Sequence, residues 1–404
     1  MRKNAVNREL RPVAGGICAP KGFKAGGIAC GIREDGGRDL ALILADRRCP
    51  VACVYSACER QGNPIAVTKK HMQSGYGRAI IANGGTANVF LPNGERLARE
   101  VCSLVSKYCN VLREEVVIAS TGYVGKPLFL APFERGIKRL SELLAADEGG
   151  GLAVAEALNN AHSQAGQLSF SFDLGDYRCK IGVIYKTSLC ASPDMATTLV
   201  FLTTDVNITP EMLDKALRAE TKATLNALRM GGGVSPNDMV CIMANGSVGN
   251  SLIDCVDSEY QKFTFALGET LKRVCRAITS RSPLAEKGIY CKITGVHSNQ
   301  AARALAKHLV EFQSVQRMLS ARTDEAPDLE SIFFALAEKG IVNIDTVRVR
   351  IQSEKGNFVL FEGGKRVPYA KESVGELLRV KEAGLCVELE EGNYSAVAYG
   401  CVWE

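Results

Sequence analysis

Apolar and polar positions follow two different periods along this chain. Seven short runs are apolar or rich in β-branched residues and predict strands, at 39–45, 116–120, 180–186, 198–204, 239–244, 346–351 and 358–361. Between these runs, apolar residues recur every three or four positions, as amphipathic helices require. No fixed short period repeats, so a repeat protein is not indicated. The pattern predicts a mixed α/β (α+β) architecture.

Three apolar stripes mark the helical spacing most clearly: Leu97, Val101, Leu104, Val105 and Tyr108; Phe133, Ile137, Leu140 and Leu144; and Tyr260, Phe263, Leu267, Leu271 and Val274. A fourth helix is predicted to open within 207–217. There Thr209 is suited to cap the helix and Pro210 to occupy its first turn.

Length and composition narrow the class of protein. A chain of 404 residues predicts two to three domains, and proline with acidic residues at 322–331 predicts a boundary before a smaller, strand-rich region from about 330. The net charge of +5 is spread among acidic residues, so nucleic acid binding is not indicated. No apolar h-region follows the start, and no apolar run approaches the roughly 20 residues of a membrane helix. We expect a cytoplasmic protein that does not bind membranes.

The spacing of cysteine, histidine and glycine argues against metal sites, a serine-type catalytic triad and phosphate-binding loops. The 15 cysteines are scattered without CxxC pairs, which predicts reduced and mostly buried thiols rather than a zinc site. The four histidines do not cluster, so neither a serine-type triad nor a metal site is indicated, and we expect surface or capping roles for them. The glycine-rich stretches at 74–80 and 229–238 lack phosphate-binding spacing and predict turns.

The segment PDMATTLVFLTTD, residues 193–205, concentrates threonines at the middle of the chain without a nearby histidine. It is either a buried strand with polar ends, or Thr197 or Thr198 is a nucleophile that brings its own base. Cutting the peptide bond before a threonine frees an α-amine, which titrates near pH ~8 and can take the hydroxyl proton.

This second interpretation needs a small residue before the nucleophile and hydrogen-bond donors for a developing oxyanion. Ala196 provides the small residue before Thr197. The loop at 119–125 follows a predicted strand, so the Thr121 hydroxyl or amide and the Gly122 amide are candidates for the donors. The spacing of the residues leaves both interpretations open.

Several segments in the same order resemble the ornithine acetyltransferase family, also called the glutamate N-acetyltransferase or ArgJ-like family. APKGF (19–23) with AGGIACGI (25–32) is similar to the family's opening. IANGGTAN (81–88), ASTGYVGKPL (119–128) and SPNDMVCIMANG (235–246) are similar to three of its internal segments. PDMATTLVFLTTD resembles the segment at which the family cuts itself between alanine and threonine.

The resemblance implies an N-terminal-nucleophile type fold, DmpA-like and ArgJ-like, cleaved between Ala196 and Thr197 into chains 1–196 and 197–404. Thr197 would carry the acyl group, Thr121 and Gly122 would form the oxyanion hole, and Lys186 would contact the substrate. The family moves an acetyl group from an N-acyl amino acid such as N-acetylornithine to an amine such as glutamate, by a ping-pong mechanism in arginine biosynthesis. It implies no cofactor or metal, an amino-acid-like substrate, and cleaved chains that form a heterodimer, paired into a heterotetramer.

The departures from the family pattern gather at the expected substrate pocket. Asn159 and Asn160 stand where the family has a threonine segment, and Pro283 stands at a substrate-binding glutamate with Glu286 nearby. The resemblance ends at Glu404, before the family's last segment. Lost polar contacts change the substrate class, so we expect a different N-acyl substrate to be preferred over N-acetylornithine. The alternatives are an acyltransferase or amidohydrolase of a specialised pathway, and a non-catalytic binding paralogue.

Overall fold

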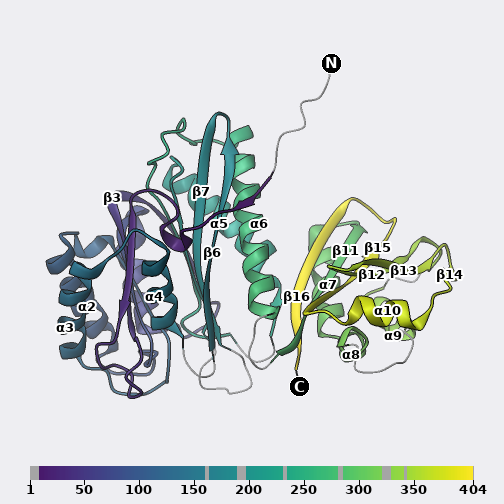
Figure 1. The fold of residues 1–404 in the computed structure, drawn as a ribbon, viewed down its shortest axis with the longest axis horizontal. Coiled ribbons are helices and arrows are strands. Elements are labelled where there is room, and N and C mark those ends of the chain that lie inside the picture. The colour runs from purple at the N-terminus through teal and green to yellow at the C-terminus, as the bar shows by residue number, and fades with distance from the viewer. Residues whose placement is uncertain are drawn as a thin grey trace. The chain divides into compact units, whose positions relative to one another are not determined.

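The computed structural model describes residues 9–159, 163–188, 197–230, 234–280, 285–320, 329–340 and 344–403. The chain divides into two compact units, one of residues 1–221 with 232–270 and one of residues 222–231 with 271–404. Each unit combines a β-sheet with helices (Figure 1), which confirms the predicted α/β class. None of the helices within these ranges is long and apolar enough to cross a membrane.

The described part of the first unit forms a nine-stranded sheet. Its strands are β1 (Arg11–Pro12), β2 (Phe23–Ile28), β3 (Leu40–Tyr55), β4 (Tyr76–Asn83), β5 (Val116–Ser120), β6 (Ser163–Leu174), β7 (Tyr177–Ser188), β8 (Leu199–Thr204) and β10 (Met239–Ala244). The order is β1-β6-β7-β8-β10-β3-β4-β5, and β2 also pairs with β3. The helices are α1 (Asn63–His71), α2 (Gly94–Cys109), α3 (Leu130–Leu143), α4 (Glu148–Leu158) and α5 (Pro210–Ala223), with the first part of α6 (Ser258–Ser280).

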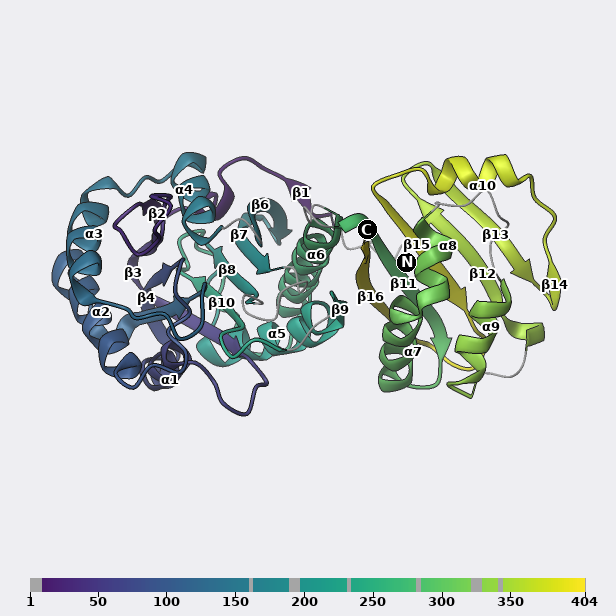
Figure 2. The ribbon, with the colours of Figure 1, turned by 90° about the horizontal axis from the view of Figure 1, so that it is seen from below.

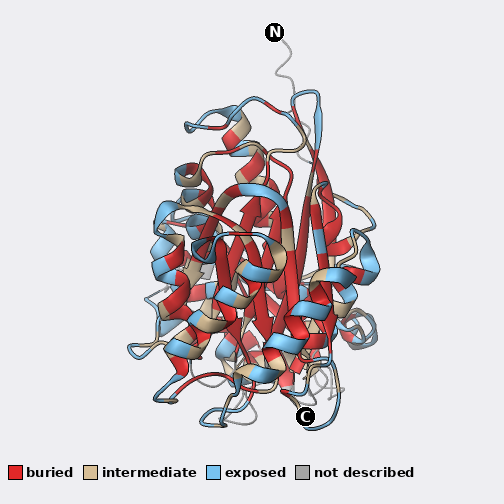
Figure 3. Ribbon diagram, turned by 90° about the vertical axis from the view of Figure 1, so that its left-hand side faces the viewer, coloured by how far each residue is buried: buried red, intermediate tan, exposed pale blue. Residues whose placement is uncertain are grey.

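Alternating apolar side chains let β3 carry cores on both faces of the sheet. Leu40 and Leu42 are buried with residues of α2 and α3, whereas Ala41 and Ile43 are buried with residues of α4. Figure 2 shows α2 and α3 side by side, and Figure 3 shows strands buried along most of their length. Burial of these two faces is the main driving force that fixes the strands.

A change of pairing along β3 joins the two ends of the sheet. Its first part pairs with β2 and β4, and its last part, Val51–Tyr55, pairs with β10. The register with β4 shifts between Leu44 and Cys49. Residues of β3, β4 and β5 share one buried cluster with residues of β7, β8 and β10. Strands from both ends of the sheet therefore share one core.

The described part of the second unit forms a seven-stranded sheet. Its strands are β9 (Leu228–Arg229), β11 (Ala285–Val296), β12 (Arg348–Ser353), β13 (Gly356–Glu362), β14 (Lys365–Arg366), β15 (Glu382–Glu388) and β16 (Tyr394–Trp403). Its order is β14-β13-β12-β15-β11-β16-β9. The helices are α7 (Asn299–Glu311), α8 (Gln313–Ser320), α9 (Leu329–Ala337) and α10 (Lys371–Leu378), which bury their apolar residues with those of the strands.

Most of the predicted elements are present, but the turn predicted at 74–80 is wrong over residues 76–80, which belong to β4. All seven predicted strands overlap strands of the sheets. The three stripes lie on α2, α3 and α6, except for Leu144, which follows the last residue of α3. Thr209 caps α5, because its Oγ1 accepts a hydrogen bond from the Met212 amide at 3.3 Å. The described cysteines are free thiols, and most are buried, as expected. The surface or capping role expected for His71 is wrong. Its side chain is buried, makes no cap hydrogen bond, and has Nδ1 2.9 Å from the Val116 carbonyl oxygen.

The predicted chains 1–196 and 197–404 are products of a cleavage, whereas the two compact units are defined by how the chain packs. The units therefore do not test the predicted cleavage. The predicted boundary at 322–331 lies mostly outside the described residues.

Candidate active site

Strand pairing brings three separate segments of the first unit to one place. Lys186, near the end of β7, lies opposite Leu199 at the start of the antiparallel strand β8. Leu199 lies beside Met239, the first residue of the parallel strand β10. The residues that immediately precede β8 and β10 are therefore neighbours, although about 40 positions separate them in the sequence. These residues include Thr197.

Lys186 connects Thr197 to the loop after β5. Its side chain is fully buried, and Nζ donates hydrogen bonds to Thr121 Oγ1 at 2.8 Å and to the Thr197 carbonyl oxygen at 3.1 Å. An ammonium group has only donors, so Thr121 Oγ1 accepts this bond and keeps its own proton for another acceptor. The Thr121 amide already donates to the Asn83 carbonyl oxygen at 2.9 Å. Of the two donors considered for Thr121, the structure leaves the hydroxyl.

Gly122 has a conformation that only glycine adopts easily. Its φ is +136°, and an added Cβ would lie 2.2 Å from the Gly85 carbonyl carbon and 2.4 Å from the Thr86 nitrogen. The neighbouring backbone is fixed, because the Tyr123 amide donates to the Gly85 carbonyl at 3.2 Å and the Ala87 amide donates to the Tyr123 carbonyl at 2.9 Å. The absence of a side chain lets the 121–123 loop lie directly on residues 85–87.

The Thr197 side chain is buried and contacts Ser235. The two hydroxyl oxygens are 2.9 Å apart. Asp238 lies next to this pair: Oδ1 accepts a hydrogen bond from the Thr198 amide at 2.6 Å, and Oδ2 accepts one from the Ser235 amide at 3.2 Å. Burial raises the pKa of Asp238 to about 6, although the two amides and the Lys186 charge act in the opposite direction. The site therefore combines two hydroxyls, a buried ammonium and a poorly solvated carboxyl.

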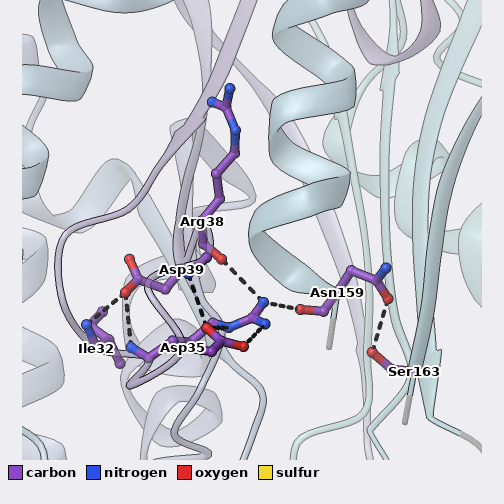
Figure 4. Close-up of polar contacts among 8 residues, drawn as sticks. Ile32, Asp35, Arg38, Asp39, Asn159 and Ser163 are labelled. Atoms are coloured by element: carbon purple, nitrogen blue, oxygen red, sulfur yellow. Dashed lines mark hydrogen bonds and ion pairs between the residues drawn. The ribbon is translucent and has the colours of Figure 1, made fainter. Parts of the chain in front are cut away.

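Asn159 lies at the end of α4, where its amide donates to the Ala155 carbonyl at 3.0 Å. Its Oδ1 accepts a hydrogen bond from Ser163 Oγ at 3.2 Å, and its carbonyl oxygen accepts one from Arg33 (Figure 4). The same guanidinium contacts the Asp35 carboxylate, and the buried Asp39 carboxylate accepts the backbone amides of residues 30–33. The hydrogen bonds with Ala155, Ser163 and Arg33 give Asn159 a structural role, at the start of the segment expected to bind substrate.

The remaining predicted site residues are not assembled with Thr197 by any described contact. Ala196 and Asn160 lie outside the described residues, as does Pro283. Glu286 is half-buried on β11 of the second unit. No group of three or more possible His, Cys, Asp or Glu metal ligands occurs in the part of the chain that the structure describes.

Sequence reasoning assigned no role to Ser235 and Asp238. Both lie in SPNDMVCIMANG, which was already noted for its resemblance to the family. The signal available was that motif alone, because proximity to Thr197 depends on the parallel pairing of β8 and β10.

Comparison with known proteins gives one consistent result. The model of the ArgJ family matches residues 24–403. The arginine biosynthesis bifunctional protein ArgJ of Symbiobacterium thermophilum is 30% identical over 392 residues, which cover 96% of each chain. The protein of the same name from Bacillus anthracis is 29% identical, covering 96% of this chain and 93% of its own. The resemblance seen in the sequence motifs is thereby confirmed.

Two solved structures are also similar. The arginine biosynthesis bifunctional protein from Bacillus halodurans is 25% identical and covers 46% of this chain and 98% of its own, with a TM-score of 0.43. The ornithine acetyltransferase of Mycobacterium tuberculosis, solved with ornithine, is 25% identical and covers 40% of this chain and 88% of its own, with a TM-score of 0.38.

Proposed function

Because the chain belongs to the ArgJ family, it is an acyltransferase, and we propose that Thr197 is the nucleophile that carries the acyl group. The observation that supports this role is the pair of hydrogen bonds from Lys186 Nζ, at 2.8 Å to Thr121 Oγ1 and 3.1 Å to the Thr197 carbonyl oxygen. They join the candidate nucleophile to the candidate oxyanion loop through a buried charge. The strand interpretation alone does not account for a buried lysine there.

The first proposed reaction is self-cleavage between Ala196 and Thr197. The Thr197 hydroxyl oxygen attacks the Ala196 carbonyl carbon, the C–N bond breaks, and the hydroxyl proton passes to the leaving nitrogen. An ester forms, with a free α-amine on Thr197. Water then hydrolyses the ester and releases the Ala196 carboxylate. Thr121 and Gly122 are the proposed donors to the oxyanion that forms on the carbonyl oxygen.

The second proposed reaction is acyl transfer in two steps. The free α-amine of Thr197 takes the hydroxyl proton as Oγ1 attacks the donor's acyl carbonyl, and the same proton leaves with the donor's amine. An acceptor amine then attacks the carbonyl carbon of the Thr197 ester, and the bond from that carbon to Oγ1 breaks. The acceptor's proton passes through the α-amine to Oγ1, which restores the hydroxyl as the acylated product departs. Because the first product leaves before the acceptor reacts, the kinetics are ping-pong.

The proposed substrates follow the pathway named for the relatives, arginine biosynthesis. An N-acyl amino acid such as N-acetylornithine is the donor and an amine such as glutamate is the acceptor. The alternative is a different N-acyl substrate, which the departures from the family pattern at Asn159 and Asn160 favour. The ammonium group of Lys186 is proposed to attract a carboxylate of the substrate. We further propose a cytoplasmic enzyme whose two cleaved chains form a heterodimer, paired into a heterotetramer.

The test compares wild type with Thr197→Ala and Thr198→Ala by denaturing gel and intact mass. We expect wild type and Thr198→Ala to give pieces 1–196 and 197–404. The hydrogen bond described for the Thr198 hydroxyl is with Thr187 Oγ1 at 3.4 Å, away from the proposed reacting atoms. Thr197→Ala should stay whole and inactive. Incubation with donor alone should add one acyl mass to piece 197–404.

Other outcomes identify the alternatives. Uncleaved wild type that binds but does not turn over a ligand indicates a binding paralogue. Cleaved wild type that releases acid without needing an acceptor indicates an amidohydrolase. Cleavage blocked in Thr198→Ala instead of Thr197→Ala would show that the nucleophile is assigned one residue too early.

A further inference from the structure

The Thr197 hydroxyl has one described partner, Ser235 Oγ, at 2.9 Å. Both residues are buried, Thr197 at 4% and Ser235 at 7% exposure, so bulk water does not replace this contact easily. In the described residues, Lys186 reaches the Thr197 carbonyl oxygen and Asp238 reaches the next amide. Ser235 is therefore the residue that contacts the oxygen atom proposed to react.

The position of Ser235 is fixed by hydrogen bonds on three sides. Its amide donates to Asp238 Oδ2 at 3.2 Å, and its carbonyl oxygen accepts a bond from Ser56 Oγ. Its own Oγ accepts the Asn237 amide at 3.3 Å. Because the other oxygen of Asp238 accepts the Thr198 amide at 2.6 Å, one carboxylate group links the Ser235 amide to the amide that follows Thr197. The distance between the two hydroxyls is set by this shared anchor.

The hydrogen bonds also favour one direction for the proton between the hydroxyls. Ser235 Oγ accepts the Asn237 amide with one lone pair, and the acceptor that the described residues offer to its O–H is Thr197 Oγ1. Donation to Thr197 Oγ1 occupies one lone pair of the nucleophile and directs the Thr197 proton away from Ser235, toward a base. A group fixed in this way lowers the cost of reaching the reactive geometry.

We propose that Ser235 is a positioning residue that donates its hydroxyl hydrogen bond to Thr197 Oγ1 and keeps its own proton throughout the reaction. This inference rests on the proposed function of Thr197. In the acylation step the Thr197 proton passes to the α-amine and then to the leaving amine, and in the second step a proton of the acceptor amine returns to Oγ1 through the α-amine. Ser235 therefore neither gains nor loses a proton. Its effect is on the orientation of Oγ1, and substrate binding does not depend on it.

The first test measures self-cleavage and steady-state turnover in wild type, Ser235→Ala and Ser235→Thr. Ser235→Ala should reduce kcat by at least tenfold with KM changed less than threefold, and Ser235→Thr should restore part of kcat because it keeps a hydroxyl. Thr204→Val is the matched control: Thr204 Oγ1 donates to the Lys180 carbonyl at 2.8 Å, at the far end of β8, and kcat should stay within twofold of wild type. Equal kcat in wild type and Ser235→Ala would overturn the proposal, as would loss of kcat that tracks loss of folded protein.

The second test does not depend on cleavage or substrate. Thr197→Cys places a thiol at the same position, and its alkylation by iodoacetamide is followed against pH by peptide mass spectrometry, with and without Ser235→Ala. A hydrogen bond donated to a thiolate lowers the thiol pKa. The midpoint should rise by roughly one pH unit when Ser235 is replaced. An unchanged midpoint overturns the role of Ser235, whereas an uncleaved, inactive wild type with a shifted midpoint overturns only the function proposed for Thr197.

Discussion

Replacing Gly122 by alanine tests whether the candidate oxyanion loop requires a glycine at this position. The same loop offers a matched control, Gly125→Ala. Both glycines have positive φ, +136° for Gly122 and +74° for Gly125. A Cβ on Gly122 would lie 2.2 Å from the Gly85 carbonyl carbon, whereas a Cβ on Gly125 meets nothing within 4 Å. Both variants therefore place alanine at a positive φ, and only Gly122→Ala adds steric overlap.

The expected magnitudes follow from these distances. Alanine at a left-handed φ costs roughly 1–2 kcal/mol, which is the whole expected loss for Gly125→Ala. At Gly122 the backbone conformation costs up to about 3 kcal/mol. The overlap adds about 1–3 kcal/mol, because the obstructing atoms belong to a hydrogen-bonded main chain. We expect Gly122→Ala to lose about 2–6 kcal/mol of unfolding free energy.

Urea unfolding of both variants measures this difference, and self-cleavage and kcat measure the chemical consequence. Gly122→Ala should also lower kcat on the order of a hundredfold or more, because moving the loop displaces a donor to the oxyanion. Gly125→Ala should cleave and turn over close to wild type. Equal unfolding free energies for the two variants, with kcat retained in both, would refute the steric argument and the loop's role together.

Two further predictions concern the same site. Thr121→Ala should lower kcat on the order of a hundredfold or more, whereas Thr121→Ser should retain most of it. The reason is that the Thr121 amide is already bonded, so the hydroxyl is the donor left available. Equal kcat in wild type and both variants would exclude the Thr121 side chain from the mechanism. Asp238 has a folded-state pKa of about 6, above the usual 3.8, so its stabilising contribution is complete below pH 4 and is lost as pH rises through 6. Between pH 4 and 7, the unfolding free energy of wild type relative to Asp238→Asn should fall by at most about 3 kcal/mol. The fall should be smaller than this limit, because Asp238 keeps some contact with solvent. Urea unfolding at several pH values measures the difference, and a difference that does not depend on pH would contradict the prediction.

Strands with continuous apolar runs could be predicted from the sequence, because burial on both faces leaves no polar position to confuse the pattern. Two of them, 116–120 and 239–244, match β5 and β10 at both ends. β2 was not predicted, because it contains Gly26 and Gly27, which are rare inside strands. Tertiary packing explains the second glycine: a Cβ there would lie 2.0 Å from the Ala153 carbonyl oxygen on α4.

The candidate site was predictable only in part, because some of its contacts depend on tertiary structure. Thr197, Thr121 and Gly122 stand in motifs that resemble a family, so the sequence could suggest them. The contact between Thr197 and Ser235 joins residues 38 positions apart and depends on the pairing of β8 with β10, which no local pattern specifies. The choice of the Thr121 hydroxyl over its amide likewise required the Asn83 contact.

The strand order has a consequence for the two pieces that cleavage would produce. β8 and β10 follow residue 197, yet they lie in the sheet between β7 and β3, which precede it. The later piece is thus inserted into the sheet of the earlier one, with backbone hydrogen bonds on both flanks. Separating the pieces would expose four unpaired strand edges, which favour aggregation. Dilution should therefore never release either piece, and each expressed alone should be insoluble unless its counterpart is made in the same cell.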